Sequence, residues 1–196
     1  MPVTFAPFGL RAIAAFGTHG NEVRAYPLPN GATCPNLNKG SPVRLTGGVV
    51  ASIGATGGGP LLGVANGFAW VDPVAGPQLR NSIPAGTSSA GLLDGDNRPA
   101  AYVVDNPNAI FLVQANSSVT VGDVGLNFNV TAVGGDVSPV YGQSPYSLQA
   151  NSRTSAINTA VKLMGLAQLP DNSWADPFPI VVVKLNGPIM QQVSAA

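Results

Sequence analysis

The stretch "AYVVDNPNAIFLVQA", from Ala101 to Ala115, contains two apolar runs separated by Asp-Asn-Pro-Asn. Both runs are rich in Val, Ile, Phe and Tyr, the residue types that favour strands. The separating residues, Asp105 to Asn108, have side chains that form Asx-turns and a proline that fixes φ. The stretch therefore predicts a β-hairpin, and its nearly unbroken apolar strands predict that both faces are covered by a second sheet or by another subunit.

Outside this stretch, 24 glycines and 18 prolines interrupt the chain of 196 residues. An interruption about every five residues leaves room for short strands and turns but little for helices. Runs of β-branched and aromatic residues bounded by Gly, Pro, Asn or Asp predict further strands. These lie at Glu22 to Leu28, Ser41 to Gly47, Val49 to Gly54, Leu61 to Val71 and Ile180 to Asn186. The fold class predicted is all-β, with a short-stranded barrel or sandwich-type core and little helix.

The C-terminal third is less regular. The segment Arg153 to Ala167 is predicted to form a strand, with a helix as the alternative because Ile157, Val161 and Met164 would share one helical stripe. The polar segment Asn127 to Ser152 is expected to be a long irregular excursion. A weak boundary at 119–125 divides a main β domain (17–125) from a C-terminal β region packed on it (126–196).

Charge is sparse in this chain. Nine basic and nine acidic residues cancel, and charged residues make up 9% of the sequence, against about 25% in an ordinary soluble domain. Such a surface offers neither the counterion release that drives nucleic-acid binding nor a polybasic attraction to lipid, so neither partner is expected. No stretch reaches the ~20 continuous apolar residues that cross a bilayer. Little self-repulsion keeps copies apart, which suits a protein packed against other subunits.

The glycine-rich segment "SIGATGGGPLLGV" (Ser52 to Val64) raises the question of phosphate binding. A Walker A loop needs a lysine after the last glycine, and here Pro60 follows Gly59. The dinucleotide pattern fails too, because Leu62 stands where its third glycine belongs. The segment is therefore interpreted as a hairpin tip between two strands, pliable enough to lie against a neighbouring subunit or in solvent.

No catalytic, cofactor-binding or metal site is predicted. His19 is the single histidine and is interpreted as a solvated turn residue. "DGDNRP" (Asp94 to Pro99) begins like a calcium loop but lacks the later glutamate. Most aspartates stand beside Gly, Pro or Asn, where turns place them. The single cysteine, Cys34, rules out an intrachain disulfide.

The segment Met1 to Phe16 has large apolar side chains without a clear period, so it is expected to be an extended arm. Sixteen extended residues reach about 50 Å, enough to cross a subunit boundary; the alternative is that the segment completes the protein's own barrel. Apolar and aromatic side chains of the arm and of two later segments are the candidate interface residues. They are Phe5, Phe8, Leu10, Ile13, Phe16, Trp70, Trp174 and Phe178.

Several motifs, in this order, carry a resemblance that covers essentially the whole chain. They begin with "PFGLRAIAAFGTHGNEVRAYPLPNG", "GSPVRLTGGVV" and "LLGVANGF", and continue with "IPAGTSS", "AYVVDNPNAIFLVQA", "VGDVGLNFNV" and "VKLMGLAQLPDNSWADPFPIVVVKLN". The chain resembles a family of small virion structural proteins of tailed bacteriophages, described as capsid cement or decoration proteins.

The resemblance implies a non-enzymatic protein on the capsid exterior, assembled in the bacterial host cytoplasm. One expected partner is the major capsid protein, whose neighbouring subunits it would clamp. The other is further copies of itself in a homo-oligomer, for which a trimer is the expected state. The alternative function is an outward-facing carbohydrate- or host-surface-binding module, in which Trp174, Tyr141 and Tyr146 would stack on sugars. Hydrolysis by paired aspartates is a third hypothesis, for which no constellation is visible.

Overall fold

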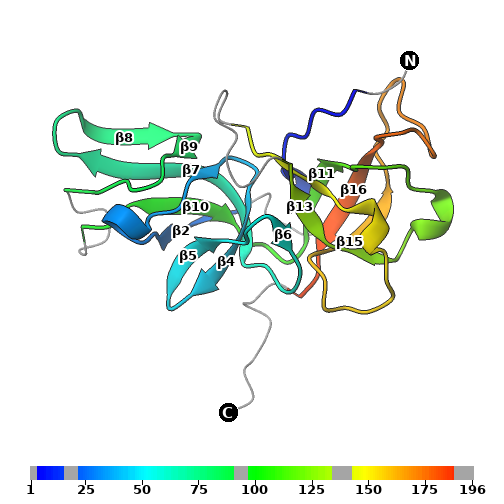
Figure 1. Cartoon of the computed structure of the whole chain (residues 1–196), viewed down its shortest axis with the longest axis horizontal. Helices are drawn as coiled ribbons and strands as arrows, with labels where there is room; N and C mark the ends of the chain where they lie inside the picture. Colours follow the sequence, from blue (N-terminus) through cyan, green and yellow to red (C-terminus); the bar gives the residue numbers. More distant parts are fainter. Residues whose placement is uncertain (1–3, 16–21, 91–96, 134–142, 188–196) are drawn as a thin grey trace, which may run out of the picture.

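Two lobes built from antiparallel strands lie side by side along the long axis of the molecule (Figure 1). The computed structural model describes residues 4–15, 22–90, 97–133 and 143–187. We call residues 22–104 the first lobe, and residues 4–15 together with 109–187 the second lobe. The all-β class predicted from the sequence is confirmed, and the sheets stack as in a sandwich without closing into a barrel.

The first lobe is organised around one large sheet. Its order is β2 (Val23–Pro27), β10 (Ala100–Val104), β7 (Gly63–Asp72), β4 (Pro42–Thr46) and β5 (Val49–Ser52), with β8 (Gly76–Arg80) also paired to β7. A two-stranded sheet, β3 (Leu37–Asn38) with β9 (Ser82–Ile83), and the 3₁₀ turn η1 (Gly31–Thr33) complete the lobe. Phe68 and Ile83 are fully buried in its apolar cluster, with Trp70 7% exposed.

The second lobe has a five-stranded sheet. Its order is β1 (Arg11–Ala15), β11 (Ala109–Gln114), β16 (Ile180–Leu185), β15 (Val161–Leu166) and β12 (Asn127–Phe128). The 3₁₀ turns η2 (Val121–Asp123) and η3 (Ala150–Ser152) lie in the same lobe. Phe111, Phe128 and Val183 are fully buried there. Each such side chain contributes roughly 1.5–3 kcal/mol to folding through its removal from water.

The strand predictions at 22–28, 41–47, 49–54, 61–71 and 180–186 are confirmed by β2, β4, β5, β7 and β16, and the two apolar runs within 101–115 form the strands β10 and β11. Within 153–167 the predicted strand is confirmed only for Val161–Leu166, which form β15, and the helical alternative is wrong. Gly165 lies where the register of β15 against β16 shifts, because a glycine inside a strand accommodates a bulge. Met164, the extra residue of that bulge, is 41% exposed.

The predicted hairpin at 101–115 is wrong, although both of its strands exist. β10 pairs with β2 and β7 in the first lobe, whereas β11 pairs with β1 and β16 in the second. Both edges of each strand are therefore occupied by other partners. The turn between them is the connector that carries the chain from one lobe to the other (Figure 1).

The segment 54–60 is not a hairpin tip. β5 and β7 flank β4 rather than each other, and β6 (Thr56–Gly57) leaves the first lobe to pair with β13 (Val130–Ala132). A Cβ placed at Gly57 would collide with the Ile53 side chain. This close packing makes the segment a fixed contact between the lobes instead of a pliable loop.

The expectation of an irregular excursion at 127–152 is also wrong for its described part. β12, β13 and β14 (Tyr146–Leu148) lie inside it, and β14, β13 and β6 form a three-stranded sheet. These strands are too short for a period to show in the sequence. Residues 134–142 fall outside the described residues.

The N-terminal segment belongs to its own chain's sheet from Arg11 to Ala15, where β1 pairs with β11. Residues 11–15 therefore follow the second alternative, in which the segment adds a strand to the protein's own sheet and does not reach across to another subunit. Consequently the whole first lobe is an insertion between two paired strands. The apolar cluster of the second lobe also includes Ile53, Leu61 and Val64 from the first lobe, so the two lobes pack on one another.

Candidate functional site

Groups that could perform chemistry are dispersed over the described residues. Among them no three His, Cys, Asp or Glu side chains gather as metal ligands would, and no helix there is long and apolar enough to span a membrane. His19, Asp94 and Asp96 lie outside the described residues. Cys34 is 2% exposed, and burial raises the pKa of its thiol to about 11.

The described aspartates mostly hold turns, as predicted from their neighbours. The Asp72 carboxylate accepts hydrogen bonds from the backbone N–H groups of Val74 and Ala75 at 2.9 and 2.8 Å, in the turn between β7 and β8. These bonds lower the pKa of Asp72. Asp176 likewise accepts from the backbone N–H of Ser173 at 2.7 Å.

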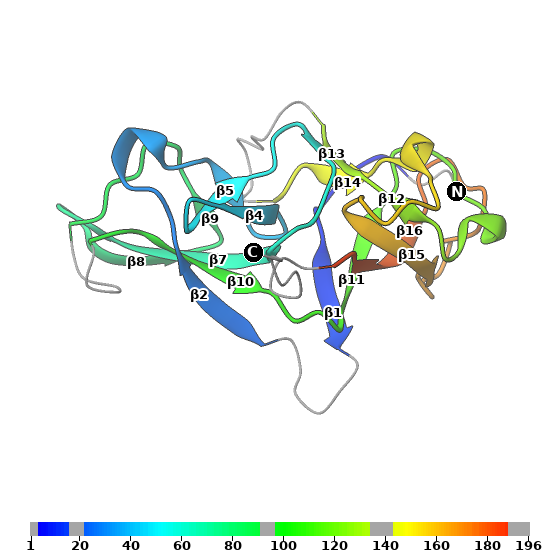
Figure 2. The same cartoon turned by 90° about the horizontal axis from the view of Figure 1, so that it is seen from below.

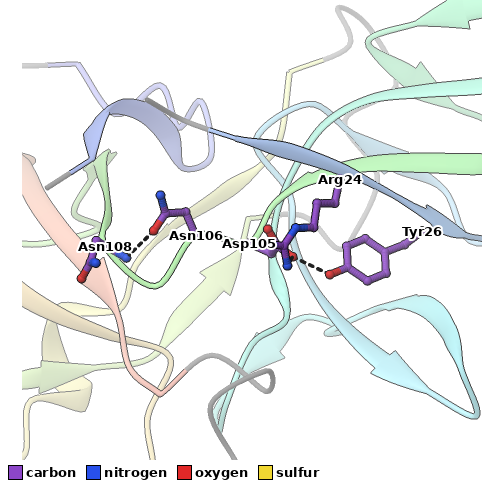
Figure 3. A network of polar contacts seen from close by, with 5 residues as sticks. All are labelled: Arg24, Tyr26, Asp105, Asn106 and Asn108. Carbon is purple, nitrogen blue, oxygen red and sulfur yellow. Dashed lines mark hydrogen bonds and ion pairs between the residues drawn. The ribbon is translucent and has the colours of Figure 1, made fainter. Parts of the chain in front are cut away.

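Asp105 is different, because its carboxylate is buried at the end of β10 (Figure 3). Its Oδ2 accepts a hydrogen bond from the Tyr26 hydroxyl and pairs with Arg24 Nη1 at 3.3 Å. Burial, together with the bond to Asp105, raises the pKa of Tyr26 to about 12. The Arg24 side chain is 57% exposed, against 2% for Asp105, and Tyr26 is half-buried, so the tyrosine is the less exposed of the two partners.

The connector that follows Asp105 is held at its other end by the second lobe. Asn106 Oδ1 accepts from the backbone N–H of Asn108 at 2.8 Å, which is the Asx-turn that the sequence predicts (Figure 3). Lys184 of β16 donates to Asn108 Oδ1 at 3.3 Å. These contacts tie the connector to both lobes, and the Asp105 side chain itself is only 2% exposed.

The candidate interface residues do not form one surface. Leu10 and Trp70 are buried in different clusters, Ile13 is 47% exposed, and Phe16 lies outside the described residues. The half-buried members are Phe5, Phe8, Trp174 and Phe178.

One pair among the candidate residues is brought together. The rings of Phe5 and Phe178 lie 5.0 Å apart between centroids. Beside them, Gln114 Oε1 accepts from the Ala6 N–H at 2.8 Å, and its Nε2 donates to the Thr4 carbonyl at 3.0 Å. Residues 4–6 are thus attached to β11 of their own chain.

A surface that the sequence did not indicate lies on the outer face of the first-lobe sheet. Val23 of β2 is 40% exposed, Leu79 of β8 is 74% exposed, and Val74 in the β7–β8 turn is 96% exposed. A shallow hollow of about 530 Å³ lies beside Val23 and Leu79. We call it the sheet-face hollow; its lining is Val23, Asn66, Gly67, Leu79, Arg80, Asn81 and Tyr102.

A second hollow, of about 580 Å³, lies between the lobes, and we call it the interlobe cleft. Two cationic side chains, Arg11 and Lys39, stand at it with the amides Asn66, Asn81 and Gln143. Its other lining residues are Phe8, Leu10, Ala12, Gly40, Val64, Ala65 and Val104. Asn66 and Asn81 also line the sheet-face hollow, so the two hollows adjoin.

Sequence reasoning missed both hollows for a physical reason. Their lining residues are separated by tens of positions, and each stands in an ordinary strand or turn context. The only local signal was the alternation in "GPQLR" (Gly76 to Arg80), which would place Leu79 on one face of a strand.

Comparisons with known proteins returned no match among protein-family models, curated proteins or solved structures.

Proposed function

We propose that this chain is a non-enzymatic virion structural protein that binds the outer surface of an assembled phage capsid and clamps neighbouring major capsid subunits. The resemblance across the whole sequence supports this role, and so does a surface with few charges. The observation that carries the proposal is the outer face of the first-lobe sheet, where Val23 and Leu79 are exposed beside Tyr102.

We assign capsid binding to this face and not to the N-terminal segment, because residues 11–15 of that segment are already paired with β11 of their own chain. Exposed valine and leucine side chains gain free energy when a partner removes them from water. The β7–β8 hairpin projects at the far end of the first lobe (Figure 1), where it can reach a second subunit. Few charges lie in the hollow itself, where Arg80 is the single ionic side chain of the lining.

We propose that copies of this chain form a homo-oligomer, and we expect a trimer. Native mass spectrometry at micromolar concentration tests this part. A trimeric mass supports the proposed oligomer, and a monomeric mass for a chain that still binds the capsid contradicts it. Capsid binding does not depend on this result, because a single copy already presents the sheet face.

The experiment for capsid binding compares two substitutions in co-sedimentation with shells that lack this protein. Leu79→Asp places a charge on the proposed face, and Ile157→Asp places one on an 82% exposed residue of the second lobe. Loss of one buried leucine, about 1.5–3 kcal/mol, corresponds to a roughly ten- to hundredfold weaker affinity. We expect this loss for Leu79→Asp alone. Equal binding by both variants would contradict the assignment of the face.

A second candidate function is a saccharide-binding module facing outward from the virion. The aromatic residues that the sequence suggests for sugar stacking do not form an exposed platform. Tyr146 is 1% exposed, and its hydroxyl donates to the Gly54 carbonyl at 2.8 Å. Trp174 packs against the second-lobe cluster, and Tyr141 lies outside the described residues. The observation that favours this function is instead the polar lining of the interlobe cleft.

A further inference from the structure

The interlobe cleft has walls from both lobes. Arg11 and Ala12 come from β1, and Val64, Ala65 and Asn66 come from β7. Figure 2 shows β1 between the strands of the first lobe and β11. The volume of about 580 Å³ lies within the roughly 300–1,000 Å³ typical of small-molecule sites. The cleft therefore has room for one or two sugar rings.

The charge of the cleft is positive and uncompensated within the described part of the chain. Arg11 and Lys39 both line it, and no Asp or Glu belongs to the lining. Neither cation has an ion-pair partner among the described residues. In a chain with only nine basic residues, two unpaired cations in one concavity favour an anionic ligand. The arginine can hold a carboxylate by two parallel hydrogen bonds.

The remaining polar groups of the cleft are neutral. Asn66, Asn81 and Gln143 each offer both a donor and an acceptor, which is the pairing that a sugar hydroxyl needs. The half-buried ring of Phe8 adds an apolar surface, on which the C–H face of a sugar ring can lie. A phosphodiester strand would need more cations, because its affinity scales with the number of neutralised phosphates.

The cleft is held in shape by backbone contacts between segments distant in sequence. The N–H of Lys39 donates to the Asn81 carbonyl at 2.6 Å, and the N–H of Gly40 donates to the Ala65 carbonyl at 2.7 Å. The N–H of Leu10, the residue before β1, donates to the Gly40 carbonyl of the first lobe at 2.9 Å. A fixed cleft loses little conformational freedom on binding.

We propose that the interlobe cleft binds a carboxylate-bearing sugar unit of a polysaccharide. Arg11 and Lys39 hold the carboxylate, Asn66, Asn81 and Gln143 bond the hydroxyls, and Phe8 packs on the ring. This inference rests on the second candidate function. It is independent of capsid binding, because the cleft belongs to the isolated chain.

The proposal is tested by isothermal titration calorimetry of the full chain with three carboxylate sugars: glucuronate, galacturonate and N-acetylneuraminate. Glucose, galactose and acetate are the matched probes that lack either the charge or the ring. We expect at least one carboxylate sugar to bind with an affinity at least about tenfold higher than that of glucose, galactose or acetate. If none binds at millimolar concentration, or if acetate binds equally well, the proposal is overturned.

Variants locate the site. Arg11→Gln and Lys39→Gln each remove one cleft cation, and Arg44→Gln removes an exposed cation from β4, outside the cleft lining. We expect about tenfold weaker binding for each cleft variant and less than about twofold change for Arg44→Gln. Equal loss in all three would mean that net charge alone attracts the sugar, and would overturn the assignment. Failure of this test leaves the capsid experiment unaffected, since that experiment probes Leu79.

Discussion

Replacing Asp105 by alanine removes the buried carboxylate that joins β10 to β2. The bond from the Tyr26 hydroxyl to this charged acceptor is worth roughly 1.5–3 kcal/mol. The ion pair with Arg24 adds at most about 1 kcal/mol, because the arginine side chain is 57% exposed. We therefore expect Asp105→Ala to lower the free energy of unfolding by about 3 kcal/mol, which lowers Tm by about 6–12 °C in a chain of this size.

Two single variants and their combinations with Asp105→Ala separate the partners. Tyr26→Phe should cost about 1.5–2 kcal/mol, and Arg24→Gln less than about 1 kcal/mol. Urea unfolding followed by circular dichroism gives the two coupling energies of the double-mutant cycles. The larger coupling should belong to the tyrosine. If Arg24→Gln proved as costly as Tyr26→Phe, the reasoning from burial would be refuted.

Three further predictions concern other positions. Gly9→Ala should lower the free energy of unfolding, measured in urea, by about 2–5 kcal/mol. Gly9 has φ +76°, where a side chain is strained, and an added Cβ would also collide with Ser144 and the Gly40 carbonyl. Gly86→Ala, with the same φ and open space around it, should cost only about 1–2 kcal/mol, and equal costs would show that packing at Gly9 is unimportant. Burial alone would raise the pKa of Asp123, but hydrogen bonds from Thr120 and the Arg153 charge outweigh it and lower that pKa. The stability from this ionised carboxylate is therefore present above its usual pKa of about 4 and is lost as pH falls through the lowered value. Asp123→Asn should then cost about 1–2 kcal/mol at pH 7, because the amide lacks the charge that strengthens these hydrogen bonds. The difference should shrink in melts recorded below about pH 4, and a constant difference would count against this. Cys34, buried with its pKa raised to about 11, should react with a thiol reagent at neutral pH only after denaturation, and prompt labelling of the folded chain would contradict its placement.

The longer strands, such as β7, β11 and β16, were predictable because each is an apolar run between breaking residues, and that signal is local. Two- and three-residue strands such as β6 and β14 were missed because they are too short to show a period. How the strands pair is not local. The Asx-turn at Asn106 forms as its sequence suggests, but the same turn serves a hairpin or a connector between lobes. The choice is made by competition among edges, since β2, β7, β1 and β16 take both sides of β10 and β11.

The candidate sites show the same limit. Trp70 and Leu10 were assigned to an interface because large apolar residues serve interfaces and cores equally well, and burial decides between them. The interlobe cleft joins residues from Phe8 to Gln143, a set that only the folded chain brings together. Its two cations were inconspicuous in the sequence because neither belongs to a charged run.

Stabilisation of an assembled capsid by this chain can be measured as the disruption temperature of shells prepared without the protein. Light scattering and electron microscopy would follow the shells during heating, with and without saturating protein. We expect saturable binding and a higher disruption temperature in the presence of the wild-type chain. A chain that stays in the supernatant, or that binds without shifting the disruption temperature, would contradict it.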